Sequence, residues 1–113
     1  MQKENALEAL AALGQETRLD VFRLLVEAGP EGLTAGAVSE GLGVRANTLS
    51  THLGVLTRSG LIRAERDGRS IIYRADLTTM QELVAYLLQD CCGGRPDQCG
   101  PLLNLFACGS KAG

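Results

Sequence analysis

The chain has 113 residues, 45% of them hydrophobic, and a formal net charge of −2, a length and composition that indicate one folded domain. No apolar run approaches the length of a membrane span, and the first residues do not resemble a secretory leader, so we expect a cytoplasmic protein with no membrane partner. All four cysteines follow residue 90, where disulfides could staple only the end of the chain, which argues against the disulfide framework of a secreted protein.

Two helices are predicted in the first 30 residues. Residues 5–13 place Leu7, Leu10 and Ala11 on one side of a short amphipathic helix. A second helix begins at Thr17 and stops at the consecutive breakers Gly29 and Pro30. Its apolar residues recur at helical spacing, at Leu19, Phe22, Leu25 and Val26.

Two further helices are predicted on either side of a glycine turn. Thr34 is a suitable N-cap for a helix that runs to about Leu42 and ends at Gly43. The next helix runs from about Arg45 to Ser59 and stops at Gly60. Its apolar positions are Leu49, Leu53 and Leu56, which leave the opposite side polar.

A hairpin and a last helix complete the predicted fold. Two short β-prone runs, 61–66 and 70–75, flank Asp67 and Gly68, a strong hairpin signal. A fifth helix follows, with a cysteine pair at its end and an apolar stripe at Met80, Leu83, Val84, Leu87 and Leu88. Two helices joined by a glycine turn and followed by a hairpin predict a winged helix-turn-helix, a mainly α fold whose second paired helix enters the major groove of DNA.

The middle of the chain is basic, although the whole chain is not. Between Gly43 and Arg74 there are six arginines and two acidic residues, a charge of +4, and the remainder holds five basic and eleven acidic residues, a charge of −6. A phosphate backbone responds to local charge, so this segment is the predicted nucleic-acid face. The six arginines are Arg45, Arg58, Arg63, Arg66, Arg69 and Arg74.

The predicted DNA contacts lie on the fourth helix and at the tip of the hairpin. Short donors and acceptors on the polar side of the helix can read base edges. Arginines that flank the tip would contact phosphate or the minor groove. The alternative is a solvated helix face with arginines that serve only solubility. The predicted DNA-binding residues are Arg45, Asn47, Thr48, Ser50, Thr51, His52, Arg66 and Arg69.

His52 is the only histidine in the chain. One histidine cannot build a two-histidine zinc site or most catalytic dyads, and no phosphate-cradling glycine loop is present. We therefore expect packing or a phosphate contact for His52, and no enzyme.

Cys91, Cys92 and Cys99 lie within nine residues, in the run CCGGRPDQC. Clustered thiolates are the ligands that soft ions prefer. A disulfide between neighbouring residues is strained, and zinc sites usually space their cysteines two to four residues apart. The pattern therefore indicates a sensor of a thiophilic ion. The alternative is that small cysteines simply cap an apolar helix.

Two motifs resemble the ArsR/SmtB family of bacterial regulators. Residues 46–74, ANTLSTHLGVLTRSGLIRAERDGRSIIYR, contain the family's S-x-H-L-x-x-L-x-x-x-G-L-[IV] core and its wing, and residues 10–29, LAALGQETRLDVFRLLVEAG, are similar to its usual start. The resemblance implies a homodimer through the first and last helices. It also implies that this dimer binds an inverted repeat in double-stranded operator DNA and is released by a metal or metalloid.

Within that family, the cysteine pattern is similar to a subgroup with a vicinal pair ending the last helix and a third cysteine shortly after. The third helix lacks the cysteines of one familiar arsenic site, and the last helix lacks the histidines of a familiar zinc site. The resemblance therefore implies an arsenite-responsive repressor in which Cys91, Cys92 and Cys99 bind As(III) as the inducer. Sb(III) and methylated arsenicals are further candidate inducers, and no organic cofactor is expected. Residues 1–90 would form the DNA-binding and dimerisation domain, and 91–113 a tail with the inducer site.

Several alternatives stay open. Cys99 or Cys108 could pair with Cys92 in a thiol redox sensor, or the thiols could respond to zinc or cadmium. A function of another class is a zinc-stabilised interaction module or a metal carrier that binds no operator. Folding that depends on metal would favour the interaction module. Cys108 is interpreted as a bystander. Its alternative roles are a fourth thiolate ligand of zinc and a replacement for Cys99 in binding methylated arsenicals.

Overall fold

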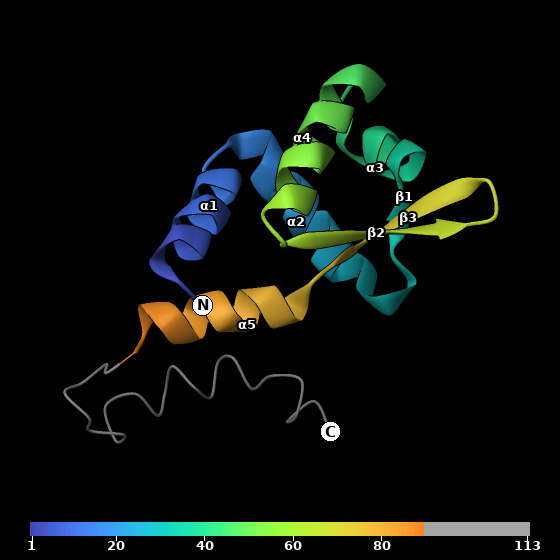
Figure 1. The fold of residues 1–113 in the computed structure, drawn as a ribbon. Helices are drawn as coiled ribbons and strands as arrows, with labels where there is room; N and C mark the ends of the chain where they lie inside the picture. Colours follow the sequence, from blue (N-terminus) through green and yellow to red (C-terminus); the bar gives the residue numbers. More distant parts are fainter. Residues whose placement is uncertain (90–113) are drawn as a thin grey trace.

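The computed structural model describes residues 1–89, which form helices around one small sheet (Figure 1). The helices are α1 (Lys3–Leu13), α2 (Glu16–Ala28), α3 (Ala35–Leu42), α4 (Ala46–Arg58) and α5 (Leu77–Leu87). A 3-10 turn (Gly29–Glu31) follows α2, and the strands are β1 (Leu33–Thr34), β2 (Ile62–Asp67) and β3 (Ser70–Ala75). The predicted winged helix-turn-helix, mainly α with a small hairpin, is confirmed.

Local signals determine the helix-turn-helix pair. The Thr34 side chain accepts a hydrogen bond from the backbone N–H of Ala37 at 3.1 Å, which satisfies one of the free donors at the start of α3. Gly43 ends α3 with φ +68° and ψ +31°, the left-handed conformation that glycine adopts without steric cost. The turn is closed where the N–H of Val44 donates to the carbonyl of Ser39 at 3.1 Å. The predicted bounds of α3 are therefore confirmed, and α4 begins one residue later than predicted.

The sheet is antiparallel with the strand order β1-β3-β2. Asp67 pairs with Ser70, so the hairpin turns over two residues. The first of these, Gly68, has φ +64°, which favours glycine. The sequence-based prediction omitted β1, which is two residues long and pairs with β3 through Leu33 and Tyr73.

The core lies between the helices and the base of the sheet. Its α4 members, Leu49, Leu53 and Leu56, are buried as predicted. In α2, whose apolar spacing predicted a helix, Phe22 and Leu25 are buried, whereas Leu19 and Val26 are 45% and 38% exposed. The remaining buried residues are Ala6, Ala9, Ala12, Val21, Val38, Leu61, Ile62 and Leu83.

The apolar side of α1 predicted from the sequence does not face the core of the single subunit. Leu7 and Leu10 are 58% and 41% exposed, and the buried stripe consists of Ala6, Ala9 and Ala12. Small alanine side chains allow α1 to approach its neighbours closely, which leaves the larger leucines on the outward side. Figure 1 shows α1 and α5 at one side of the molecule, with the β2–β3 hairpin projecting from the other.

Helix α5 is shorter than predicted. It ends at Leu87, four residues before Cys91, so the prediction that the cysteine pair closes this helix is not confirmed. Of its predicted apolar stripe only Leu83 is buried, and Leu87 is 53% exposed. None of the helices in residues 1–89 has both the length and the apolar character that a membrane-spanning segment needs.

Candidate nucleic-acid interface

The two sides of α4 differ sharply in polarity. Its leucines are buried against the core, whereas Asn47, Thr48, Ser50 and Thr51 are all exposed on the opposite side. Hydroxyl and amide groups of this size hydrogen-bond to base edges when a helix enters the major groove. The fold therefore presents the predicted base-reading residues together on one exposed helix surface.

The start of α4 combines a positive charge with free backbone donors. Arg45 is the exposed N-cap residue, and its side chain makes no capping hydrogen bond. The first N–H groups of a helix lack intrahelical partners and carry partial positive charge, which suits a phosphate. The Asn47 side chain accepts from the N–H of Thr48 at 2.9 Å, so one of these donors is already satisfied.

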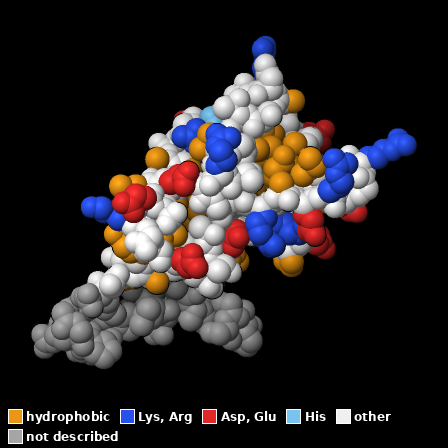
Figure 2. Space-filling view, in the orientation of Figure 1, with side chains coloured by type: hydrophobic (Ala, Val, Ile, Leu, Met, Phe, Trp, Pro, Cys, Tyr) orange, Lys and Arg blue, Asp and Glu red, His pale blue; other side chains and the backbone are white. Residues whose placement is uncertain are grey.

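The wing carries two arginines at its tip. Arg66 pairs with Ile71 across the β2–β3 hairpin and Arg69 occupies the turn, and both side chains belong to exposed residues. Among residues 1–89, neither arginine takes part in an ion pair. Figure 2 shows Lys and Arg side chains at the end of the projecting hairpin, to the right of the view. These charges are therefore available to a phosphate backbone.

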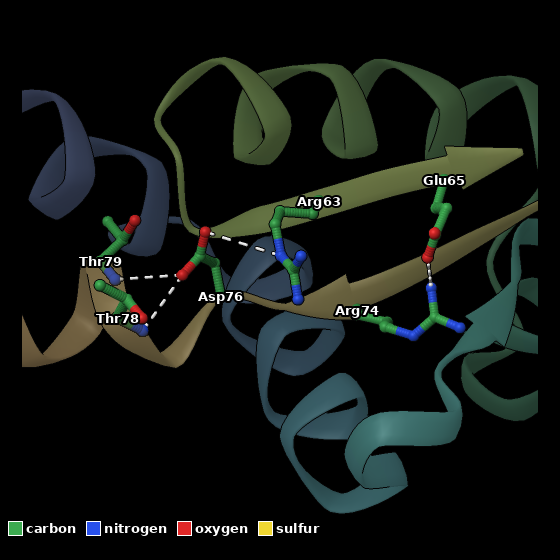
Figure 3. A network of polar contacts seen from close by, with 6 residues as sticks. All are labelled: Arg63, Glu65, Arg74, Asp76, Thr78 and Thr79. Atoms are coloured by element: carbon green, nitrogen blue, oxygen red, sulfur yellow. Dashed lines mark hydrogen bonds and ion pairs between the residues drawn. The ribbon is translucent and has the colours of Figure 1, made fainter.

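Two other arginines of the basic segment are engaged within the protein (Figure 3). The Arg74 guanidinium forms an ion pair with Glu65, and its Nε donates to the carbonyl of Pro30 at 2.7 Å. Arg63 lies 3.7 Å from Asp76. The charge of the basic segment is therefore not all available to nucleic acid, because Arg74 in particular is held against the 3-10 turn.

His52 is half-buried beside the recognition surface of α4. Its Nδ1 lies 3.3 Å from Nη1 of Arg18, which belongs to α2. Arg18 is not among the site residues predicted from the sequence. The available signal was its place near the start of the second predicted helix, directly before the apolar position Leu19, since an arginine within an apolar helix pattern needs polar partners.

The proposed inducer ligands Cys91, Cys92 and Cys99, together with Cys108, lie outside the described residues. Within residues 1–89, no group of three or more His, Cys, Asp or Glu side chains is placed to hold a metal ion. Helix α3 contains no cysteine. The thiol cluster after residue 90 is therefore the candidate ion site that the sequence offers.

Comparisons with known proteins agree with this geometry. A family model described as a helix-turn-helix domain matches residues 13–65. An uncharacterised helix-turn-helix-type transcriptional regulator of Mycobacterium tuberculosis strain H37Rv, Rv0081, is 33% identical over 78 residues, which cover 69% of this chain and 67% of that protein.

Two solved structures are similar along most of the chain. An ArsR-like transcriptional regulator from Rhodococcus sp. RHA1 superposes with a TM-score of 0.70 at 25% identity, over 92% of this chain and 93% of that one. A protein described as a possible transcriptional regulator for arsenical resistance has a TM-score of 0.62 at 28% identity, over 71% of this chain and 80% of that one.

Proposed function

The chain belongs to the ArsR/SmtB family of helix-turn-helix transcriptional regulators, and from that premise we propose that it is a dimeric repressor that arsenite releases from its operator. The observation that carries the DNA-binding part is the exposed polar side of α4 beside an arginine-tipped wing. The observation that supports arsenite as the inducer is the set of three cysteines within nine residues after α5.

In the proposed complex, α4 lies in the major groove. Asn47, Thr48, Ser50 and Thr51 read base edges there, and they account for sequence preference. Arg45 at the start of α4, and Arg66 and Arg69 on the wing, contact phosphates. These contacts are independent of sequence and weaken as salt rises.

The dimer is proposed to form through α1 and α5. Leu7 and Leu10 on α1 and Leu87 on α5 are large apolar side chains on exposed surfaces, and the two helices contact each other. Covering them with a second copy would remove this apolar surface from water, which contributes roughly 1.5–3 kcal/mol for each fully buried leucine. Two copies related by a two-fold axis would present their α4 helices to half-sites about one helical turn apart in an inverted repeat.

The inducer is proposed to bind Cys91, Cys92 and Cys99. Thiolate sulfur suits a soft, thiophilic ion, and As(III) is complete with three ligands because its lone pair takes the fourth corner. Gly93 and Gly94 follow the pair and allow the chain to double back toward Cys99. Sb(III) and methylated arsenicals present similar chemistry. Because α5 ends four residues before Cys91, the ligands directly follow a helix of the proposed dimer interface.

Release requires differential binding. The dimer has one conformation that fits DNA and one that does not. To shift operator occupancy, arsenite must bind the second conformation more tightly than the first, by at least about 1–3 kcal/mol. Ordering of the cysteines against α5 would change the placement of the two α4 helices, so that both no longer match successive major grooves.

A thiol redox sensor is the second candidate, because four cysteines fall between residues 91 and 108. In that mechanism an oxidant removes two electrons and two protons from Cys92 and either Cys99 or Cys108, which then form a disulfide. A disulfide between Cys91 and Cys92 is disfavoured by the geometry of neighbouring residues.

A gel-shift titration distinguishes these mechanisms. The operator-bound protein is titrated separately with arsenite, zinc, cadmium and the thiol oxidant diamide. Arsenite alone should release the DNA at stoichiometric concentration. Release by diamide but not by arsenite would favour the redox sensor, and release by zinc or cadmium at lower concentration would replace the metalloid by a divalent ion. No binding to any duplex would leave the interaction module or metal carrier.

A further inference from the structure

One guanidinium joins three helices in this structure. Arg18, in the first turn of α2, donates from Nε to the carbonyl of Ala12 at 2.7 Å and from Nη2 to the carbonyl of Ala11 at 3.4 Å. Its Nη1 lies 3.3 Å from Nδ1 of His52 in α4. The side chains of both Arg18 and His52 belong to half-buried residues. The last turn of α1 and the recognition helix are therefore held by the same side chain.

The chemistry of the two partners determines the state of the histidine. A guanidinium has only donors, so Nδ1 of His52 must accept and carry no hydrogen. The ring hydrogen is then on Nε2, because the bond made by one ring nitrogen sets the tautomer of the other. Nε2–H is the remaining donor of a ring that belongs to the DNA-facing helix.

The contacts to α1 explain why Arg18 is a firm support. The last carbonyls of a helix lack intrahelical partners and carry partial negative charge, so a guanidinium at this end is stabilised. Three donors of one planar group are used at once, which restricts the orientation of the side chain. The backbone N–H of Arg18 also donates to the Gln15 side chain at 2.9 Å, which fixes the start of α2.

We infer that Arg18 is a positioning residue for DNA binding, which orients His52 and holds its hydrogen on Nε2 so that this nitrogen donates to a DNA phosphate. The inference rests on the proposed DNA contact of α4. Arg18 acts through His52 and not by touching DNA. It also makes the recognition helix sensitive to the position of the last turn of α1, a helix of the proposed dimer interface.

A double-mutant cycle tests the inference. Affinity is measured by fluorescence anisotropy on a labelled mixed-sequence duplex of about 30 base pairs, long enough for two half-sites one turn apart, so that no operator sequence is needed. Arg18→Gln, His52→Gln and the double variant are compared with the parent. Arg23→Gln is the matched control, because Arg23 lies on the same helix and its ion pair within residues 1–89 is with Glu27, 3.7 Å away at the surface.

Arg18→Gln and His52→Gln should each weaken binding about tenfold relative to Arg23→Gln, the size of one lost charge-assisted hydrogen bond. The double variant should bind no more weakly than either single variant, because both remove the same contact. Equal affinities of Arg18→Gln and Arg23→Gln, or additive losses in the double variant, would overturn the inference. A parent that binds no duplex would instead contradict the proposed DNA-binding function.

A second measurement does not depend on the variants folding. Because His52 is the only histidine, nitrogen-15 NMR of the parent reports its ring tautomer without ambiguity. The parent should show Nε2–H, and Arg18→Gln, where folded, a mixture of tautomers. A parent with its hydrogen on Nδ1 would overturn the inference even if Arg18→Gln fails to fold.

Discussion

The guanidinium of Arg63, near the start of β2, lies 3.7 Å from the carboxylate of Asp76 (Nε to Oδ2). The same carboxylate N-caps α5, because its Oδ1 accepts from the N–H groups of Thr78 and Thr79 at 3.1 and 3.2 Å (Figure 3). The N–H of Asp76 donates to the carbonyl of Leu61 at 2.8 Å. The base of the wing is therefore tied to the first turn of α5, so that a displacement of α5 would move the wing with it.

The arginines of the wing tip should act on phosphate alone. Replacing Arg66 and Arg69 by Ala should weaken binding to all duplexes alike and lower the slope of log affinity against log salt by about 0.9 for each lost contact. Arg63→Ala is the control, because that side chain faces Asp76 at the base of the wing and its loss should leave the slope unchanged. A changed base preference with an unchanged slope would show that the wing tip reads bases.

The exposed side of α4 should determine base preference. Asn47→Ala and Thr51→Ala should reduce discrimination between the operator and single-base variants, by about 1–3 kcal/mol at the contacted pair, with little change in the salt slope. Thr57→Ala serves as the control, because the Thr57 hydroxyl donates to the carbonyl of Leu53 at 2.7 Å within the same helix. Selection from a random duplex pool measures the preference. Identical selected sequences for the parent and both variants would exclude these two positions from base readout.

Helix α1 should be needed for dimerisation. A charge at position 10 would be buried in the proposed interface, so Leu10→Glu should raise the dimer dissociation constant at least about tenfold, in keeping with the 1.5–3 kcal/mol gained by burying a leucine. Ile71→Glu is matched to it, because Ile71 is exposed to the same extent, 41%, but lies on the wing. Sedimentation velocity gives both constants. An unaffected Leu10→Glu dimer would place the interface elsewhere.

Gly32 should be the glycine least tolerant of replacement in the fold. It has φ +68°, and a Cβ there would lie 2.6 Å from the carbonyl oxygen of Tyr73, which belongs to the strand paired with β1. Gly32→Ala should therefore reduce the free energy of unfolding by roughly 2 kcal/mol or more. Gly43→Ala has the same φ but open space around the added carbon, and should cost about 1 kcal/mol. Urea unfolding compares them, and equal losses would argue against the close approach at Gly32.

The secondary-structure elements that could be predicted from the sequence are those marked by residues close to them in the chain. The cap at Thr34, the left-handed glycine at Gly43 and the turn that follows Asp67 act within a few residues, and the elements that they bound are confirmed. Strand β1 is only two residues long and exists through its pairing with β3, some 40 residues away in the chain. No local pattern marks such a strand.

The faces of α1 and the role of Arg74 depend on tertiary packing. The pattern of Leu7 and Leu10 favours an apolar side, but the alanine stripe is the side that α2 and α4 accommodate. Arg74 counts as positive charge in the sequence, yet Glu65 and the carbonyl of Pro30 hold it. The Arg18–His52 contact joins residues 34 positions apart. The spacing of residues within one helix cannot indicate a contact between two different helices.

The most direct test of the central claim is the release of operator DNA by arsenite, followed by fluorescence anisotropy on an operator selected from a random pool. The parent is compared with Cys91→Ser, Cys92→Ser and Cys99→Ser, and Cys108→Ser is the control. We predict that all five proteins bind the operator equally, and that arsenite releases the parent and Cys108→Ser at one equivalent per subunit. The other three variants should stay bound at the same arsenite concentration. Release of Cys99→Ser at the parent's arsenite concentration, or loss of operator binding in the metal-free variants, would contradict the claim and indicate a different ligand set or a structural zinc site.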